Sequence, residues 1–191
     1  MKSLEQFIQE KLKVSKKSKE PIVVKSLFDL KYIVSKRYME NEEVIDMSDI
    51  DISELTDISG IFSKCKNLRT IIGIEDWDTK EILNMREMFE DCYNLHDIGD
   101  LSGWDTSNVK YMTHMFYECK NLECKGIDDW NVENVRDISE MFYGCKSLTC
   151  DLSKWKLSSI KNRMQCWHIF RDSVYAGKKE KQPAGLYNEI S

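Results

Sequence analysis

The stretch Trp104–Leu122, "WDTSNVKYMTHMFYECKNL", decides the fold that we expect for this chain. After its tryptophan it carries Asp, Thr, Ser and Asn, the residue types that cap a helix start by accepting backbone N–H bonds. Apolar residues then recur at helical spacing, at Val109, Met112, Met115, Phe116 and Cys119. The stretch therefore predicts a capped helix of about three turns.

The same pattern recurs along the chain. Five phenylalanines are spaced 27, 27, 26 and 28 residues apart, at Phe62, Phe89, Phe116, Phe142 and Phe170. Other residues keep fixed distances from them and form the repeat scaffold: Cys65, Leu68, Trp77, Met88, Cys92, Leu95, Trp104, Met115, Cys119, Leu122, Trp130, Met141, Cys145, Leu148 and Trp155. The first unit has Ile50 in the tryptophan position and the last carries a three-residue insertion, as expected of end caps.

The second half of each unit is short, as in residues 94–104, and predicts one strand and a turn. A unit this small cannot bury its apolar face alone, whereas stacked units share a continuous core. We therefore expect an α/β fold, a leucine-rich-repeat-type solenoid of about five strand–helix units of 26–28 residues with an N-terminal helical cap. The expected divisions are residues 1–20 as a basic leader or helix, 21–45 as the helical cap, 46–173 as the solenoid, and 174–191 as a C-terminal cap and tail.

Within the cap, residues 24–41 predict one longer helix. Leu27, Leu30, Ile33 and Val34 line one stripe of it, and Tyr38 extends the stripe by a turn. The helix precedes the first repeat, so we expect it to cover the open edge of the repeats, which would otherwise template aggregation.

The unit at residues 104–122 resembles the repeat of the BspA-like leucine-rich repeat surface proteins, and the resemblance covers about residues 46–173. It implies a repeat fold and, for the secreted members, adhesion and binding of host proteins; many members have no assigned function. A second resemblance concerns residues 1–10, "MKSLEQFIQE", which are similar to the capsid-targeting leader of internal proteins of T-even-like bacteriophages. Such a leader would be cut after Ile8-Gln9-Glu10. The alternative is an ordinary amphipathic N-terminal helix.

The charge and hydropathy of the sequence limit the kinds of molecule that we expect the protein to bind. Residues 1–37 carry a balance of +6 within a whole-chain charge of −5, which leaves −11 for the remainder. The acidic body argues against nucleic acid as a ligand, except through the basic N-terminus. No segment has the length of a signal peptide's apolar run or of a membrane span. We therefore expect no membrane insertion and a cytoplasmic chain, or alternatively a component of a phage virion, with its seven cysteines as thiols.

Four cysteines suggest a metal site. Cys119, Cys124, Cys145 and Cys150 form two pairs of x4 spacing, which stacked units would bring together as the four thiolates of a zinc site. Cys119 and Cys145 also fit the repeat position of Cys65 and Cys92, where a small buried apolar side chain suffices. We expect no metal and no cofactor; pairing of Cys124 with Cys150 on oxidation is left open.

No catalytic constellation is evident. His96, His114 and His168 have no repeated Ser, Cys or Asp partner, and the acidic turns do not match a calcium loop. We therefore expect a non-enzymatic module that binds another protein. The candidate binding stripe consists of residues that differ between units seven positions after each phenylalanine: Arg69, His96, Glu123 and Thr149. The alternatives are a virion-packaged phage protein and a relative of the secreted adhesins.

Overall fold

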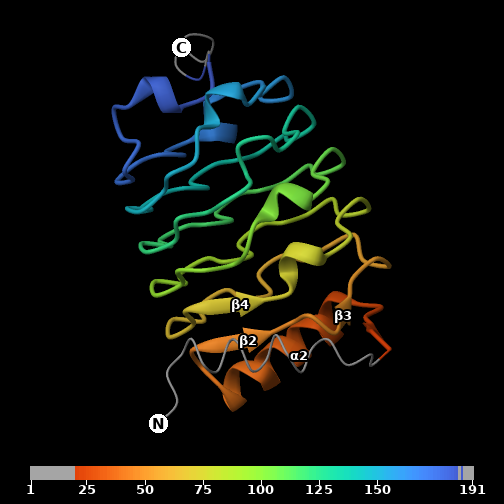
Figure 1. Ribbon diagram of the computed structural model, residues 1–191. Coiled ribbons are helices and arrows are strands. Elements are labelled where there is room, and N and C mark those ends of the chain that lie inside the picture. The colour runs from red at the N-terminus through yellow and green to blue at the C-terminus, as the bar shows by residue number, and fades with distance from the viewer. Residues whose placement is uncertain (1–19, 185, 187–191) are drawn as a thin grey trace.

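The computed structural model describes residues 20–184 and 186. The leader-like residues 1–10 therefore lie outside the described residues. The chain winds back and forth in layers from the N-terminal to the C-terminal end (Figure 1). The elements are β1 (Ile22–Val23), α2 (Leu27–Glu40), β2 (Val44–Asp46), β3 (Ile50–Asp51), β4 (Thr70–Ile72) and five 3-10 turns, at Ile74–Asp76, Leu101–Gly103, Leu152–Lys154, Arg163–Cys166 and Lys179–Lys181.

The strands form two small parallel sheets. β1 pairs with β3 with Ile22 opposite Ile50, and β2 pairs with β4 with Val44 opposite Thr70. Among the described residues, α2 is the only α-helix, and it lies within the span that the sequence predicts. Ser26 caps it by accepting the N–H of Asp29.

Helix α2 packs on the first layers of the chain through Leu30 and Val34, which are buried. Its Arg37 makes a bidentate ion pair with Asp49, at 2.8 and 3.0 Å, and also donates to the carbonyl of Asp46. At its C-terminal end, the Tyr38 hydroxyl accepts the N–H of Asn67 at 3.2 Å.

The expected solenoid of five strand–helix units is wrong. Over residues 46–173 the structure has 3-10 turns, short strands and loops, and the segments expected as helices contain no α-helix. The positive φ angles of His114 (56°) and Glu118 (59°) would break a right-handed helix in the Trp104–Leu122 stretch. Successive turns occur instead, in which the N–H groups of Met115 and Tyr117 donate three residues back.

The expected helix cap is wrong for the same stretch. Asp105 accepts the N–H of Ser107 at 2.9 Å, which closes an Asx-turn rather than starting a helix. Thr106 is buried and donates to the carbonyl of Asn131 at 3.1 Å, and Asn108 donates to Lys80 at 2.7 Å. These polar side chains therefore tie neighbouring layers together.

Each layer contains a turn-rich stretch that we call a phenylalanine segment; the five segments are residues 57–64, 84–91, 111–118, 137–144 and 165–172. Alternate N–H groups of one segment donate to alternate carbonyls of the next. In the third segment the N–H groups of Met112, His114, Phe116 and Glu118 donate to the fourth at 2.8 to 3.1 Å. Backbone hydrogen bonds between layers thus replace the internal bonds of the expected helices.

The core is built from columns of identical side chains. Neighbouring phenylalanine rings from Phe62 to Phe170 stack with centroids 5.4 to 5.7 Å apart. The tryptophans from Trp77 to Trp155 stack beside them at 5.8 to 6.5 Å. The thiols of Cys92, Cys119 and Cys145 each donate to a phenylalanine carbonyl of the preceding layer at 3.0 Å.

Candidate protein-binding surface

The structure brings the predicted stripe together in two pairs. The N–H of His96 donates to the carbonyl of Arg69 at 2.9 Å, and the N–H of Thr149 donates to Glu123 at 3.3 Å. Arg69, His96 and Thr149 are exposed, and Glu123 is half-buried. Glu43 extends the stripe by one layer, since its Oε1 lies 3.9 Å from Nε of Arg69.

A gap separates the two pairs. The connection from Leu122 to Trp130 is one residue shorter than the one from Leu95 to Trp104. Cys124 takes a positive φ of 58° there, and no backbone bond joins His96 to Glu123 among the described residues. A small surface pocket of about 90 Å³ lies between the two pairs and is lined by His96, Asp97, Ile98, Gly99, Leu122, Glu123, Cys124 and Lys125. The predicted stripe is therefore interrupted.

A second row of polar and aromatic side chains crosses the phenylalanine segments. We call it the acid–tyrosine row, and it consists of Glu90, His114, Tyr117, Glu140 and Tyr143. The imidazole of His114 lies between two carboxylates, with Nδ1 3.6 Å from Glu90 and Nε2 3.6 Å from Glu140. One side chain thus connects three neighbouring segments.

The tyrosines of this row are ordered by stacking. The rings of Tyr117 and Tyr143 lie 4.9 Å apart, and the ring of His114 lies 5.1 Å from that of Tyr117. Burial, followed by the nearby Glu140, raises the pKa of Tyr117, and a hydrogen bond with Asp172 raises the pKa of Tyr143. Both phenols therefore stay protonated at neutral pH.

The sequence analysis missed the acid–tyrosine row. Its members sit one residue after a phenylalanine, as Glu90, Tyr117 and Tyr143 do, or two residues before one, as His114 and Glu140 do. These positions vary between units like those of the predicted stripe. The variation was the available signal, but only the positions seven residues after each phenylalanine were compared between units.

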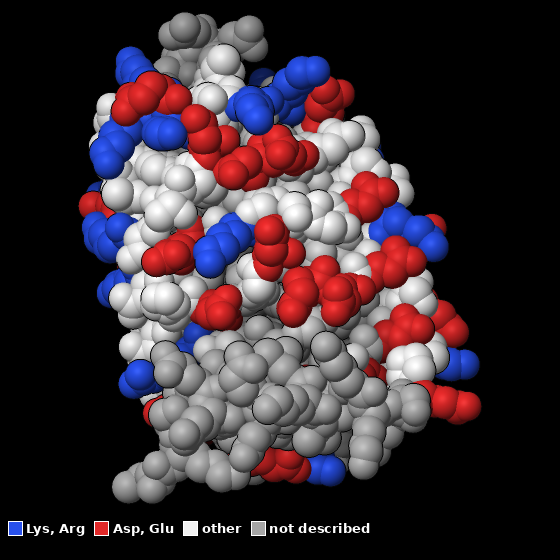
Figure 2. Space-filling model, in the orientation of Figure 1, with Lys and Arg blue, Asp and Glu red and all other residues white. Residues whose placement is uncertain are grey.

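Charge on the face shown in Figure 2 is unevenly distributed. Asp and Glu side chains gather across its middle, whereas Lys and Arg are more frequent towards its left edge and top. Acidic residues in the turns of the phenylalanine segments include Glu87, Asp91 and Glu118, which take positive φ angles.

The cysteines do not form a metal site in the described residues, where no group of three or more His, Cys, Asp or Glu side chains could hold a metal ion. Cys119 and Cys145 point into the core and donate to backbone carbonyls, and Cys124 and Cys150 are buried free thiols. Burial raises the pKa of all four thiols, to about 11 for Cys150, which disfavours the thiolate.

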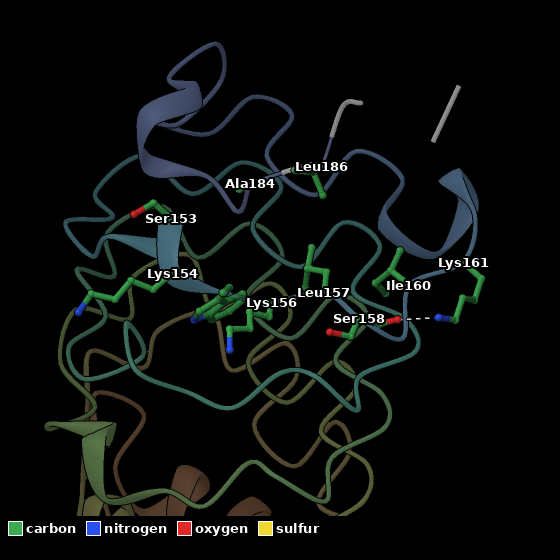
Figure 3. A pocket seen from close by; sticks show the side chains of 10 residues that line it. Ser153, Lys154, Lys156, Leu157, Ser158, Ile160, Lys161, Ala184 and Leu186 are labelled. Carbon is green, nitrogen blue, oxygen red and sulfur yellow. Dashed lines mark hydrogen bonds between the residues drawn. The ribbon is translucent and has the colours of Figure 1, made fainter. Parts of the chain in front are cut away.

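A pocket of about 540 Å³ lies near the C-terminal end, where the three-residue insertion lengthens the last unit (Figure 3). Its cations are already engaged: Lys154 lies 3.2 Å from Asp129, Lys156 lies 3.3 Å from Glu133, and Lys161 donates to the carbonyl of Ser158 at 2.6 Å. Each of these three lysines therefore already has a partner within the protein.

Comparison with known proteins places the chain in a family. It belongs to the family described as "Mycoplasma protein of unknown function, DUF285", which matches residues 29–155. No curated protein matches the chain, and no solved structure matches it. In the described residues, no helix has the length and apolar character needed to cross a membrane.

Proposed function

We propose that this protein is a non-enzymatic module that binds another protein through the acid–tyrosine row. The observation that carries the proposal is the division of each layer between fixed and variable side chains. The fixed phenylalanines, tryptophans and cysteines are buried, while the positions of the row carry Glu, His or Tyr and are half-buried. Repeat proteins build recognition surfaces by varying surface side chains on a conserved scaffold.

The row has the composition of a contact surface. Tyrosine is enriched at protein interfaces because it supplies large contact area at small entropic cost. Tyr117 and Tyr143 are held by stacking before a partner arrives, and Glu90 is held by Ser63 at 3.0 Å as well as by His114. Preorganised side chains lose less entropy on binding, and the acidic groups select basic side chains in the partner.

The predicted stripe is a second contact surface in this proposal. Arg69 and Glu43 pair at its start, and Thr149 lies at its end. The resemblance to BspA-like surface proteins also implies a binding role. The acid–tyrosine row is favoured because its members contact one another across the layers, whereas the stripe is interrupted between His96 and Glu123.

A capture experiment tests the proposal. The full chain, Tyr117→Ala/Tyr143→Ala and Asp78→Ala/Lys80→Ala would each be used to capture proteins from the cells that make it. Asp78 and Lys80 form an exposed ion pair outside both surfaces, so this variant controls for general effects. We expect one partner to be lost with the tyrosine variant alone. No partner, or a partner retained by Tyr117→Ala/Tyr143→Ala and by Arg69→Ala/Thr149→Ala, would overturn the proposal.

We also propose that the protein works in the cytoplasm. The seven cysteines are free thiols, which suits a reducing compartment. Fractionation of the producing cells would contradict this assignment if the chain were recovered from the outer surface or the medium.

A further inference from the structure

In the part of the chain that the structure describes, no further segment pairs with the outer backbone edge of the last phenylalanine segment, residues 165–172. In the segment before it, the N–H groups of Ile138, Glu140, Phe142 and Gly144 donate to this last segment at 2.7 to 3.0 Å. The equivalent donors of the last segment are the N–H groups of Cys166, His168, Phe170 and Asp172. Within residues 20–184 and 186, the N–H groups of His168, Phe170 and Asp172 meet no backbone acceptor, whereas that of Cys166 lies inside the 3-10 turn Arg163–Cys166.

A groove follows this edge. It has a volume of about 530 Å³, within the range of sites that hold small ligands. The last segment forms one wall from Cys166 to Arg171, and Ala176, Gly177 and Leu186 form part of the other. A peptide in the groove would therefore lie against the unpaired N–H groups. Backbone pairing of this kind supplies affinity, while the wall side chains supply specificity.

The wall of the groove is basic and aromatic. Arg163 and Arg171 are exposed, and the guanidinium of Arg163 lies 5.2 Å from the ring of Trp167. The ring of His168 lies 4.1 Å from that of Trp167, and its nitrogens lie 3.3 and 3.5 Å from Arg171. The nearby carboxylate of Asp172 lies 3.8 Å from Arg171, so it offsets part of one positive charge. Arg163 has no carboxylate within ion-pair distance among the described residues.

We propose that this edge binds an acidic peptide segment of another protein, whose alternate backbone carbonyls accept the N–H groups of His168, Phe170 and Asp172. The fourth segment, residues 137–144, shows that an acidic stretch of chain can pair its carbonyls with the N–H groups of a phenylalanine segment. It carries Asp137 and Glu140, and its carbonyls at Asp137, Ser139, Met141 and Tyr143 accept the N–H groups of the third segment. This inference concerns a different surface from the acid–tyrosine row and does not depend on it.

Amide hydrogen exchange of the full chain, followed by NMR, tests the pairing directly. The probe is a synthetic peptide with the sequence of residues 137–144, DISEMFYG. The same peptide with both acids replaced by amides, and with both replaced by lysine, provides matched controls. We expect the N–H groups of His168, Phe170 and Asp172 to exchange faster than those of His114, Phe116 and Glu118 in the free protein. The acidic peptide should slow the exchange of these three groups.

Charge reversal tests the partner's chemistry. Arg163→Glu/Arg171→Glu should weaken binding of the acidic peptide about tenfold, since each exposed charge pair contributes up to about 1 kcal/mol and repulsion adds to the loss. The same variant should bind the lysine peptide more tightly than the parent chain does. Lys25→Glu/Lys36→Glu makes an equal charge change at the opposite end of the molecule, and we expect it to leave binding unchanged.

Several outcomes would overturn the proposal. One is slow exchange of the N–H groups of His168, Phe170 and Asp172 in the free protein at low concentration, since they would already be paired. Slow exchange only at high concentration, with a dimer in sedimentation, would identify a second copy of the chain as the occupant instead. Equal binding of the acidic, neutral and basic peptides, or protection confined to other amides, would also contradict it.

Discussion

The rings of Phe89 and Phe116 lie nearly parallel, with their centroids 5.4 Å apart and their planes tilted by 7°. The two residues are 27 positions apart, so the contact joins two layers of the chain. The N–H of Phe89 also donates to the carbonyl of Met115 at 2.9 Å. Ring stacking and a backbone hydrogen bond therefore hold the same two layers together. The stacking continues from Phe116 to Phe142 in the next layer.

Phe116→Ala should be among the most destabilising single substitutions in the chain. The side chain is fully buried between Phe89 and Phe142, so truncation leaves a cavity in the middle of the column. We expect a loss of about 3–5 kcal/mol in the free energy of unfolding, measured by denaturant titration. Leu83→Ala is the control, since Leu83 is 42% exposed and its loss should remain below about 1 kcal/mol. Similar losses in the free energy of unfolding for both variants would contradict a stabilising role of the stacked phenylalanines in the core.

Glu87→Gly should stabilise the protein. Glu87 is exposed and holds a φ of 56°, a conformation that costs a side-chain-bearing residue about 1–2 kcal/mol and glycine almost nothing. The greater freedom of glycine in the unfolded chain offsets part of the gain, so we expect up to about 1 kcal/mol from thermal or denaturant unfolding. Glu81→Gly, at an exposed glutamate without a positive φ, should instead lose about 0.5–1 kcal/mol. Destabilisation by Glu87→Gly would show that the turn does not take this conformation.

Gly73→Ala should destabilise the protein for a steric reason. Gly73 has a φ of 88°, and a Cβ atom there would overlap the backbone of Ser48 in the neighbouring layer. Strain and overlap together should cost about 2–4 kcal/mol in the free energy of unfolding. Gly103→Ala is the matched control, because the nearest atom to its added Cβ, the carbonyl oxygen of Glu75, would be 3.6 Å away. An equal effect at both glycines would argue against the close approach at Ser48.

Stability should decline at alkaline pH. Burial raises the pKa of Cys65 to about 11 and keeps the buried thiols of Cys92, Cys119 and Cys145 protonated. In the unfolded chain a thiol titrates near ~8.5, so the stabilisation is complete below that pH and is lost as the pH rises towards the folded value. Denaturant unfolding between pH 7 and 10.5 in a reducing agent checks this.

Cys65→Ala provides the control for that titration, since the variant should lose less stability than the parent chain over the same rise in pH. A flat profile from pH 7 to 10.5 would contradict burial of the thiols. A profile that rises with pH would contradict the sign of the shifts.

The apolar spacing of residues 104–122 did not distinguish a helix from a series of tight turns. Both conformations return to the same side after three or four residues, so Met112, Met115, Phe116 and Cys119 face the core in either case. The choice depends on backbone partners in the next layer, because the N–H of His114 bonds Ser139 rather than a residue of its own segment. For the same reason the acid–tyrosine row was not predicted from the sequence, since the contacts of His114 with Glu90 and Glu140 and of Tyr117 with Tyr143 all cross between layers.

The sequence by itself determined the repeat interval, the identity of the core residues and a helix within residues 24–41, because these follow from local spacing and side-chain chemistry. Tertiary structure alone decided the backbone conformation of each repeat, since hydrogen bonds between layers stabilise positive φ angles that isolated segments disfavour. It also decided which variable residues meet at the surface, and within the described residues it left the N–H groups of His168, Phe170 and Asp172 without a backbone acceptor.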